Sequence, residues 1–240
     1  MKEKIKEYWD WRGESYDKSP GHYYRTEEAK RAWINLLRET LDGENLRILD
    51  VGTGTGFLAI LLAELGHKVT GIDMAEGMLK VAKKKAKNLK IDFMIGDAEN
   101  LMFEDNEFDC VVSRHLLWTL PNPEKAIKEW VRVAKDKVVV IDGKWHDGST
   151  VSNIRQLIWK MKMLISYGRI GYHYKKEIRK NLPYADGIKP EDVVNMFRSY
   201  GLSNISIQDI SYIRKIDHNR ISRIFHNYNT FLIKGEKNDR

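Results

Sequence analysis

Three glycines spaced two residues apart are the first pattern in the chain that could do chemistry. They follow a strand-like run with a single acid, residues 47–51, and precede a run of helix formers, residues 57–65. A strand, turn and helix of this kind form half of a nucleotide-binding unit, because glycines let the backbone approach a ligand and a helix start offers free N–H groups. The pattern predicts that a nucleotide-containing cofactor binds at Asp50, Gly52, Thr53, Gly54 and Gly56.

The spacing of the glycines separates two kinds of nucleotide cofactor. A dinucleotide fingerprint requires glycine, one residue, glycine, two residues, glycine, because the pyrophosphate sits on the helix N-terminus. The position that such a site fills with glycine or alanine is Phe57 here, and its bulky ring argues against a pyrophosphate. An NAD-dependent protein therefore remains only as an alternative.

Acidic residues end the next two predicted strands. The second strand, residues 68–73, ends at Asp73, and the third, residues 90–96, is followed by Asp97. Asp73 comes 17 residues after Gly56, where a carboxylate can accept hydrogen bonds from both hydroxyls of a ribose. The simpler alternative for Asp73 alone is a helix cap.

The glycine turn with its acid resembles motif I of the class I S-adenosylmethionine-dependent methyltransferases. In residues 108–124, Phe-Asp, three apolar residues and a small polar residue lead into a Leu-Pro-Asn-Pro-Glu turn. This stretch is similar to the ubiquinone/menaquinone-biosynthesis-type methyltransferases. The resemblance covers residues 45–142 well and the rest of the chain only in layout. It implies an α/β fold, with a Rossmann-like, seven-stranded, mostly parallel sheet, a C-terminal antiparallel hairpin, helices on both faces and helical lid segments.

The chain departs from the family pattern in two places. The usual Lys-Pro-Gly-Gly turn is replaced by residues 134–137, Ala-Lys-Asp-Lys, which leaves the start of the fifth strand open. The Asn/Asp-Pro-Pro-Tyr motif of many nucleic-acid amino-methyltransferases is absent at the tip of the fourth strand.

The resemblance implies S-adenosyl-L-methionine as the cofactor, with S-adenosyl-L-homocysteine as the product. An adenine needs an acceptor for its amino group and a donor for a ring nitrogen, which Asp97 and the N–H of Ala98 would supply. Met74 would lie against the adenine. Ser113 and Arg114 would face the methionine end, and Tyr16 would lie near the cofactor, although the aromatic residues around Tyr16 fit a core role equally well.

A general base is needed only if the accepting atom carries a proton that it will not otherwise lose. His115 is the candidate, because a neutral histidine titrates near working pH and the strand tip faces the methyl group. A structural or substrate-pocket role for His115 is equally open, and Asp142 is a weaker candidate base, as is His173. Arg114 could hold an anionic substrate or pair with an acid. Predicted substrate contacts are Trp118, Tyr167, Tyr172 and His173.

These residues need a scaffold, and the chain is predicted to be one methyltransferase domain, residues 1–240. Its parts are an N-terminal helical lid (1–42), a cofactor-binding core (43–142), a cap insertion (143–189) and a C-terminal helix with the last strands (190–240). In the lid, Gly13 is expected to interrupt a first helix and Thr26 to cap a second. Strands are expected at 138–142, 205–209 and 227–234. A helix over 149–167 is expected to bury Ile154, Leu157, Ile158, Met161, Leu164 and Ile165.

Composition limits the class of protein. The single cysteine, Cys110, excludes an internal disulfide and argues against a zinc cluster. No run approaches ~18 apolar residues, so no membrane span is expected. The charged N-terminus lacks the apolar core of a signal peptide. A cytoplasmic enzyme is therefore expected.

The predicted function is in-line methyl transfer from S-adenosyl-L-methionine to a small, partly apolar molecule. Residues 169–240 carry six of the seven excess positive charges that make up the formal net charge of +7. A solvated lysine-rich surface is the simpler explanation, and a surface for an anionic partner the other. The alternative functions are an RNA methyltransferase that uses this basic third, which carries no appended RNA-binding module, and a non-catalytic cofactor-binding protein. The sequence does not indicate an oligomeric state.

Overall fold

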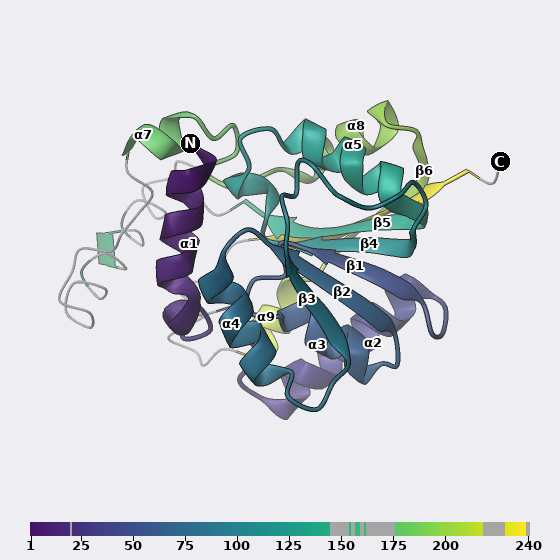
Figure 1. The fold of residues 1–240 in the computed structure, drawn as a ribbon, viewed down its shortest axis with the longest axis horizontal. Coiled ribbons are helices and arrows are strands. Elements are labelled where there is room, and N and C mark those ends of the chain that lie inside the picture. The colour runs from purple at the N-terminus through teal and green to yellow at the C-terminus, as the bar shows by residue number, and fades with distance from the viewer. Residues whose placement is uncertain are drawn as a thin grey trace.

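A computed structural model describes residues 1–19, 21–144, 176–217 and 229–238, together with positions 154, 157, 158 and 161. Its centre is a seven-stranded sheet in the order β3-β2-β1-β4-β5-β7-β6 (Figure 1). The strands are β1 (Arg47–Val51), β2 (Lys68–Asp73), β3 (Ile91–Ile95), β4 (Phe108–Arg114), β5 (Ala134–Gly143), β6 (Leu202–Asp209) and β7 (Thr230–Lys237). Neighbours among β1 to β5 run parallel, and β7 is antiparallel to both β5 and β6. The predicted fold class is confirmed.

Two helical layers cover the sheet. Apolar residues of α2 (Glu27–Leu41), α3 (Phe57–Glu64) and α9 (Ser211–Asp217) form one core with β1, β4 and β5. Residues of α5 (Pro123–Val133) and α8 (Pro190–Ser199) form the second core, on the opposite face (Figure 1). The order of strands reverses between β1 and β4, and ligands of open α/β sheets bind beyond the carboxyl ends of the strands at such a point.

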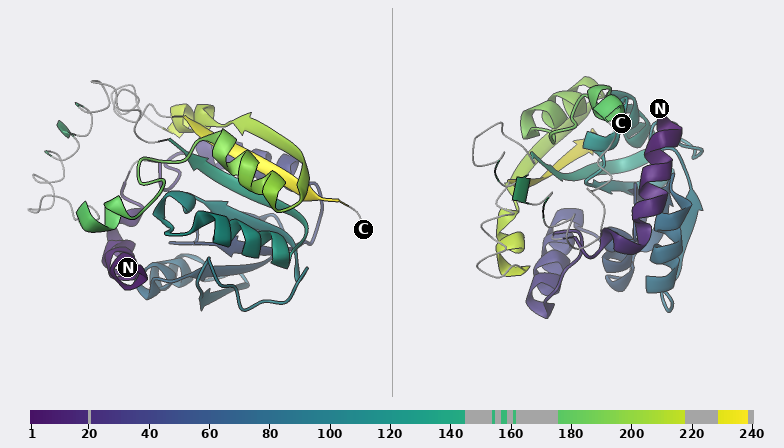
Figure 2. Two further views of the ribbon diagram at one scale, coloured as in Figure 1. Left: turned by 90° about the horizontal axis from the view of Figure 1, so that it is seen from above. Right: turned by 90° about the vertical axis from the view of Figure 1, so that its left-hand side faces the viewer.

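Helix α1 (Lys2–Tyr16) stands apart from these layers. It runs alongside α4 (Glu76–Lys85), next to the carboxyl ends of the strands (Figures 1 and 2). Two glycines bring the helices together, because a Cβ on Gly13 would lie 2.5 Å from the Gly77 carbonyl oxygen. The Gly77 N–H also donates to the Asp10 carboxylate at 2.7 Å. The helix therefore continues through Gly13, and the expected interruption is wrong.

Several expectations for individual elements are corrected. Helix α2 begins after the Thr26 cap as expected, and its apolar face packs into the core that it shares with α3 and the sheet. Strand β5 starts at Ala134, because the backbone turns extended there directly after α5. Strand β6 starts at Leu202, three residues earlier than expected, and β7 starts at Thr230, three residues later. Helix α9, which lies between them, was not anticipated.

The helix expected over 149–167 falls largely outside the described residues, as do Leu164 and Ile165. Positions 154, 157, 158 and 161 are helical, in agreement with the prediction. Their side chains are not buried, however: the exposed fractions are 53% for Ile154, 61% for Leu157, 42% for Ile158 and 53% for Met161. At these four positions the expected helix is present and the expected burial is wrong, because apolar periodicity does not say what packs against a face. The short helix α7 (Lys176–Lys180) follows.

Candidate functional site

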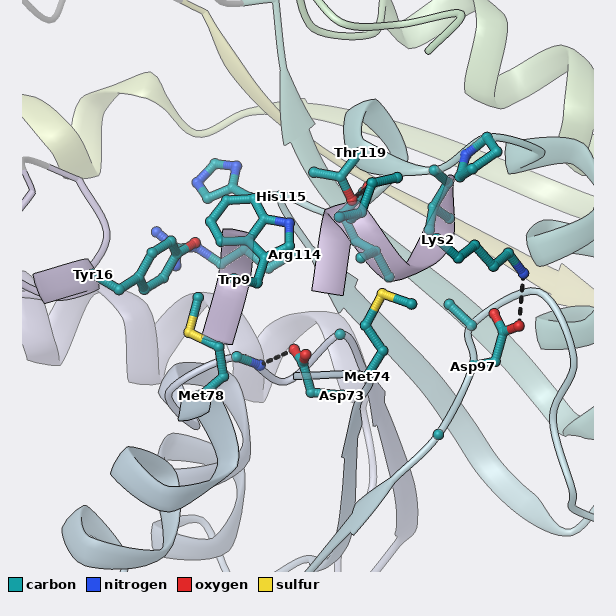
Figure 3. A pocket seen from close by; sticks show the side chains of 18 residues that line it. Lys2, Trp9, Tyr16, Asp73, Met74, Met78, Asp97, Arg114, His115 and Thr119 are labelled. Carbon is teal, nitrogen blue, oxygen red and sulfur yellow. Dashed lines mark hydrogen bonds and ion pairs between the residues drawn. The ribbon is translucent and has the colours of Figure 1, made fainter. Parts of the chain in front are cut away.

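A cavity lies beyond the carboxyl ends of the central strands, enclosed on its outer side by α1 (Figure 3). Its free volume is about 60 Å³. Part of the wall is supplied by α1 itself, through Lys2, Ile5, Trp9 and Tyr16. The opposite wall comes from the glycine turn and from the residues that follow β2, β3 and β4. The cavity therefore lies where the sequence placed its candidate residues, at the topological switch point.

The glycine turn presents bare backbone to this cavity. Gly52 and Gly54 line it, and their φ angles of 68° and 56° lie in the left-handed region that favours glycine. A Cβ on Gly52 would come within 2.7 Å of the Leu116 side chain, so a larger residue would need Leu116 to move. The turn therefore combines a conformation and a close approach that need glycine.

Four of the predicted cofactor residues support this wall without lining the cavity. Asp50 Oδ2 accepts hydrogen bonds from Thr53 Oγ1 at 2.6 Å and from the Ala59 N–H at 3.1 Å, which ties the turn to the start of α3. Burial raises the pKa of Asp50 to about 7, although both hydrogen bonds oppose the shift. Ser113 Oγ donates to the last carbonyl of β1 at 2.8 Å. Asp50, Thr53, Gly56 and Ser113 are thus placed behind the cavity.

Asp73 lines the cavity from the end of β2, and both of its carboxylate oxygens are held in place. Oδ2 accepts from the Gly54 N–H at 2.9 Å and Oδ1 from the Ala75 N–H at 2.9 Å. Burial raises the pKa of Asp73 to about 6, against the effect of these two bonds. A backbone hydrogen bond from Met74 also opposes the pKa shift, and the carboxylate, with about four acceptor sites, keeps capacity for a ligand hydroxyl. The structure therefore orients Asp73 through the glycine turn itself.

Asp97 and Ala98 line the cavity after β3, where an unpredicted residue meets them. Lys2 Nζ lies 2.6 Å from Asp97 Oδ2 and 2.7 Å from the buried Glu99 carboxylate (Figure 3). The Ala98 carbonyl accepts a hydrogen bond from Trp130 Nε1 at 3.0 Å, so α5 helps to fix the position of this loop. Lys2 is 95 residues from Asp97 in sequence, and no local pattern indicates such a contact.

Apolar and aromatic side chains fill the middle of the site. Met74 and Met78 point into the cavity from the α4 side, and Trp9 and Tyr16 from α1 (Figure 3). The ring centroids of Trp9 and Tyr16 are 5.7 Å apart in an edge-to-face arrangement. Burial raises the pKa of Tyr16 to about 12, so its hydroxyl stays protonated at neutral pH. Tyr16 and Met74, which were predicted to lie near the cofactor, both line this cavity.

Arg114 and His115 form the inner end of the cavity, at the tip of β4. His115 has a φ of 58°, its side chain is 6% exposed, and its Nδ1 lies 4.0 Å from Asp142 Oδ1. Burial and the neighbouring Arg114 lower the pKa of His115 well below its usual value, so the imidazole is neutral at physiological pH. Burial raises the pKa of Asp142 to about 7.

Of the predicted substrate residues, Trp118 is described by the structure and does not line the cavity. Trp118 lies in the 3₁₀ turn Leu117–Thr119, and its ring packs edge-on against Trp9 at 6.1 Å. Tyr167, Tyr172 and His173 lie outside the described residues. Lining residues that were not assigned to the site in advance include Lys2, Trp9, Leu116, Thr119 and Leu120. Of these, only Trp9 had a local signal, its helical spacing with Ile5.

Comparison with known proteins identifies the domain around this site. Residues 49–141 match the family model described as "Methyltransferase domain". Residues 49–141 therefore form a methyltransferase domain. The family that the sequence resembled is therefore confirmed for the segment that holds the glycine turn, Asp73, Asp97 and the β4 tip.

Curated relatives of the methyltransferase domain extend the match. The chain is 38% identical over 115 residues to the demethylmenaquinone methyltransferase of Renibacterium salmoninarum, over 47% of this chain and 48% of the relative. It is 29% identical over 197 residues to the demethylmenaquinone methyltransferase of Staphylococcus saprophyticus, over 77% of this chain and 82% of the relative. The match thus spans about half the length of the first of these relatives.

Solved structures share the fold of the methyltransferase domain and its flanking elements. The magnesium protoporphyrin IX methyltransferase of Synechocystis, solved with bound SAH, superimposes with a TM-score of 0.62 at 17% identity, over 99% of this chain and 100% of that chain. At this identity the likeness concerns the fold alone. Among the residues that the structure describes, no helix has the length and apolar character of a membrane-spanning segment.

Proposed function

We propose that the protein transfers the methyl group of S-adenosyl-L-methionine to a small, partly apolar acceptor. The observation that supports this most is the meeting of the glycine turn, Asp73, the Asp97–Ala98 pair and His115 around one cavity. The glycine turn and the two aspartates can bind a nucleoside at one end of the cavity. The neutral imidazole of His115 lies at the other end. The apolar lining from α1, Met74 and Met78 suits an acceptor with an apolar ring.

The donor set fits the cofactor part by part. Asp73 keeps acceptor capacity for a ribose hydroxyl, and the open Cβ position of Gly54 leaves room for the methionine portion along the turn. Asp97 would accept from the adenine amino group while the Ala98 N–H donates to the ring. The cofactor supplies an electrophilic methyl group on its sulfonium. The protein supplies position, orientation and exclusion of water.

Cofactor entry requires α1 to move. The free volume of about 60 Å³ has room for a few water molecules, because the side chains of α1 occupy much of the site. Lys2 is bonded to Asp97 Oδ2, the oxygen that the adenine amino group would approach. We infer that Lys2 withdraws or shares this carboxylate when the cofactor binds, and that α1 then closes over it.

His115 is the group in the site best placed to accept a proton. It is neutral at physiological pH because burial and Arg114 oppose its protonation. A neutral imidazole can take the proton that an acceptor oxygen or nitrogen releases during methyl transfer. Asp142, 4.0 Å from His115 Nδ1, could then stabilise the imidazolium. This role applies only to acceptors that carry such a proton.

Calorimetric titration tests the proposal directly. The purified protein is titrated in parallel with S-adenosyl-L-methionine, S-adenosyl-L-homocysteine and NAD. Micromolar binding of the first two without binding of NAD is expected, because Phe57 occupies the place of the third dinucleotide glycine. Binding of NAD alone, or of none of the three, would overturn the proposal.

An acceptor screen with labelled methyl groups follows. The names of the curated relatives make demethylmenaquinone-type quinones the first small acceptors to test. RNA is included as a separate arm because of the basic C-terminal third. Methylation of RNA and of no small molecule would replace the proposed acceptor class while leaving the cofactor assignment intact.

A further inference from the structure

A second cavity lies behind the tip of β4. Arg114 and His115 line both cavities, so the two share a wall at the inner end of the cofactor site. The other walls come from the Gly21–Tyr23 turn, from α2 and α3, from α9 with the residue before it, and from Thr230 at the start of β7. All of these residues belong to the described part of the chain. The second cavity therefore adjoins the place where an acceptor would meet the methyl group.

Two arginines give this cavity its charge. Arg114 comes from β4 and Arg214 from α9, and both line it. Arg114 donates to the carbonyls of Gly21 and His22 at 2.5 and 3.4 Å, and its guanidinium lies 4.1 Å from the Phe57 ring. In the part of the chain that the structure describes, no carboxylate forms an ion pair with Arg114, and its buried Nε has no hydrogen-bond partner. Its charge is therefore balanced by carbonyl dipoles and an aromatic face rather than by a direct anion.

Burial lowers the pKa of both arginines, and the charge of Arg114 lowers that of Arg214 further. The resulting pKa is about 10 for Arg114 and about 9 for Arg214. Asp217 also lines the cavity, and its charge opposes the lowering of the Arg214 pKa, while its Oδ1 accepts the Arg25 N–H at 2.5 Å. The two arginines outnumber this one carboxylate in the lining. An anion placed between two buried cations relieves both their repulsion and their desolvation. The electrostatics thus favour a negatively charged guest.

A neutral donor completes the cavity. Thr230 is 4% exposed, and its Oγ1 has no hydrogen-bond partner among the described residues. Its backbone is fully engaged, since its N–H donates to Ser211 Oγ at 3.0 Å and its carbonyl accepts from the Ile210 N–H at 2.9 Å. A buried hydroxyl without a partner is unfavourable, and a bound acceptor group would remove that penalty.

We propose that the second cavity binds an oxyanion of the methyl acceptor, a carboxylate or a phosphate, between Arg114, Arg214 and the Thr230 hydroxyl. The inference rests on the proposed methyl-transfer function and narrows its acceptor class to partly apolar molecules that carry such a group. Through the shared wall, the anion would fix which acceptor atom faces His115.

The size of the second cavity sets a condition on binding. Its free volume is about 20 Å³, enough for one water-sized group. The Arg214 guanidinium rests on the Gly21 backbone, where a Cβ would lie 2.8 Å from Arg214 Nη1. An oxyanion therefore enters by turning this guanidinium away from Gly21. Because Arg114 is held by two carbonyls, we expect Arg214 to be the side that moves.

The test uses the protein saturated with S-adenosyl-L-homocysteine and two probes, inorganic phosphate and acetate, at constant ionic strength. Calorimetry and thermal unfolding measure their binding to the natural protein, Arg214→Gln, Thr230→Val and the control Arg198→Gln, whose arginine is exposed on α8. We expect millimolar binding of at least one probe, weakened about tenfold or more in Arg214→Gln and severalfold in Thr230→Val, and unchanged in Arg198→Gln. The stronger probe identifies the carboxylate or the phosphate as the guest.

The outcomes separate this inference from the function on which it rests. Failure of S-adenosyl-L-homocysteine to bind would contradict the methyltransferase proposal. Binding of S-adenosyl-L-homocysteine without binding of either probe, or equal probe binding by all variants, would contradict the oxyanion site alone. If Arg214→Gln does not fold, Thr230→Val decides, because it removes only the hydroxyl and should stabilise the free protein while weakening the binding of the probe severalfold.

Discussion

At the scale of single residues, Asp73 has the most consequential environment in the site. Its pKa of about 6, raised by burial, means that the carboxylate is mostly ionised at pH 7 and mostly protonated at pH 5. Protonation removes acceptor capacity that the ribose hydroxyls need. The affinity for S-adenosyl-L-homocysteine should therefore fall about tenfold between pH 7 and pH 5.

The Asp73→Asn variant tests this origin of the pH dependence. Calorimetry from pH 5 to 8 should give weak binding that varies little with pH, because the titrating group is gone. Asp92→Asn is the matched control, since Asp92 is exposed and lies near the start of β3, at the end of the strand away from the cavity. If Asp73→Asn kept both the affinity and the pH profile of the natural protein, the ribose assignment would be wrong.

His115 calls for a kinetic prediction with the acceptor that the screen identifies. If it removes the acceptor proton, His115→Gln should lower kcat by about 10²–10⁴ without changing the affinity for S-adenosyl-L-homocysteine. Because its pKa is lowered well below 6.5, the acidic limb of the natural protein's kcat profile should also lie well below that value. The control is His67→Gln, a second buried histidine at the start of β2. Near-normal turnover at every pH would leave His115 with a structural role.

At the scale of elements, we predict that the docking of α1 on α4 controls access to the cavity. A Cβ on Gly77 would collide with the Asp10 carbonyl of α1, so Gly77→Ala should push α1 away from α4. We expect faster hydrogen exchange in residues 2–16 and faster association and dissociation of S-adenosyl-L-homocysteine, with the sheet intact. Lys80→Ala, an exposed change on the same helix, should alter neither. Unchanged exchange in Gly77→Ala would show that α1 does not gate the site.

The elements also show what local sequence could and could not predict. The glycine spacing and the apolar runs predicted β1, α3 and β2 closely, because turn chemistry and burial patterns are properties of neighbouring residues. The Lys2–Asp97 ion pair, the Gly13–Gly77 contact and the Trp130–Ala98 hydrogen bond were not foreseen, because each joins residues that are distant in sequence. Gly13 illustrates the difference. Its local propensity predicts an interrupted helix, whereas its close contact with α4 requires a helical residue that has no side chain.

At the scale of the whole molecule, the proposed cofactor cavity joins segments that the sheet alone does not hold together. Its walls come from α1, the glycine turn and the ends of β2, β3 and β4, so a ligand contacts both the sheet and the helix outside its layers. The second cavity adds α9 and β7 to the same region. Binding should therefore stabilise the molecule globally and slow the opening of α1 in particular.

Thermal unfolding with hydrogen exchange measures both effects. At a concentration of S-adenosyl-L-homocysteine about 100 times its Kd, the stabilisation is about 2.7 kcal/mol, which for a chain of this size raises Tm by about 5–10 °C. NAD at the same concentration should leave Tm unchanged, and Asp73→Asn should lose most of the shift. Exchange in residues 2–16 should slow more than in the central strands, because α1 gains contacts on its inner side that those strands already have. A rise in Tm without slower exchange in α1 would mean that the cofactor is held by the sheet alone. The Lys2–Asp97 ion pair would then take no part in cofactor binding.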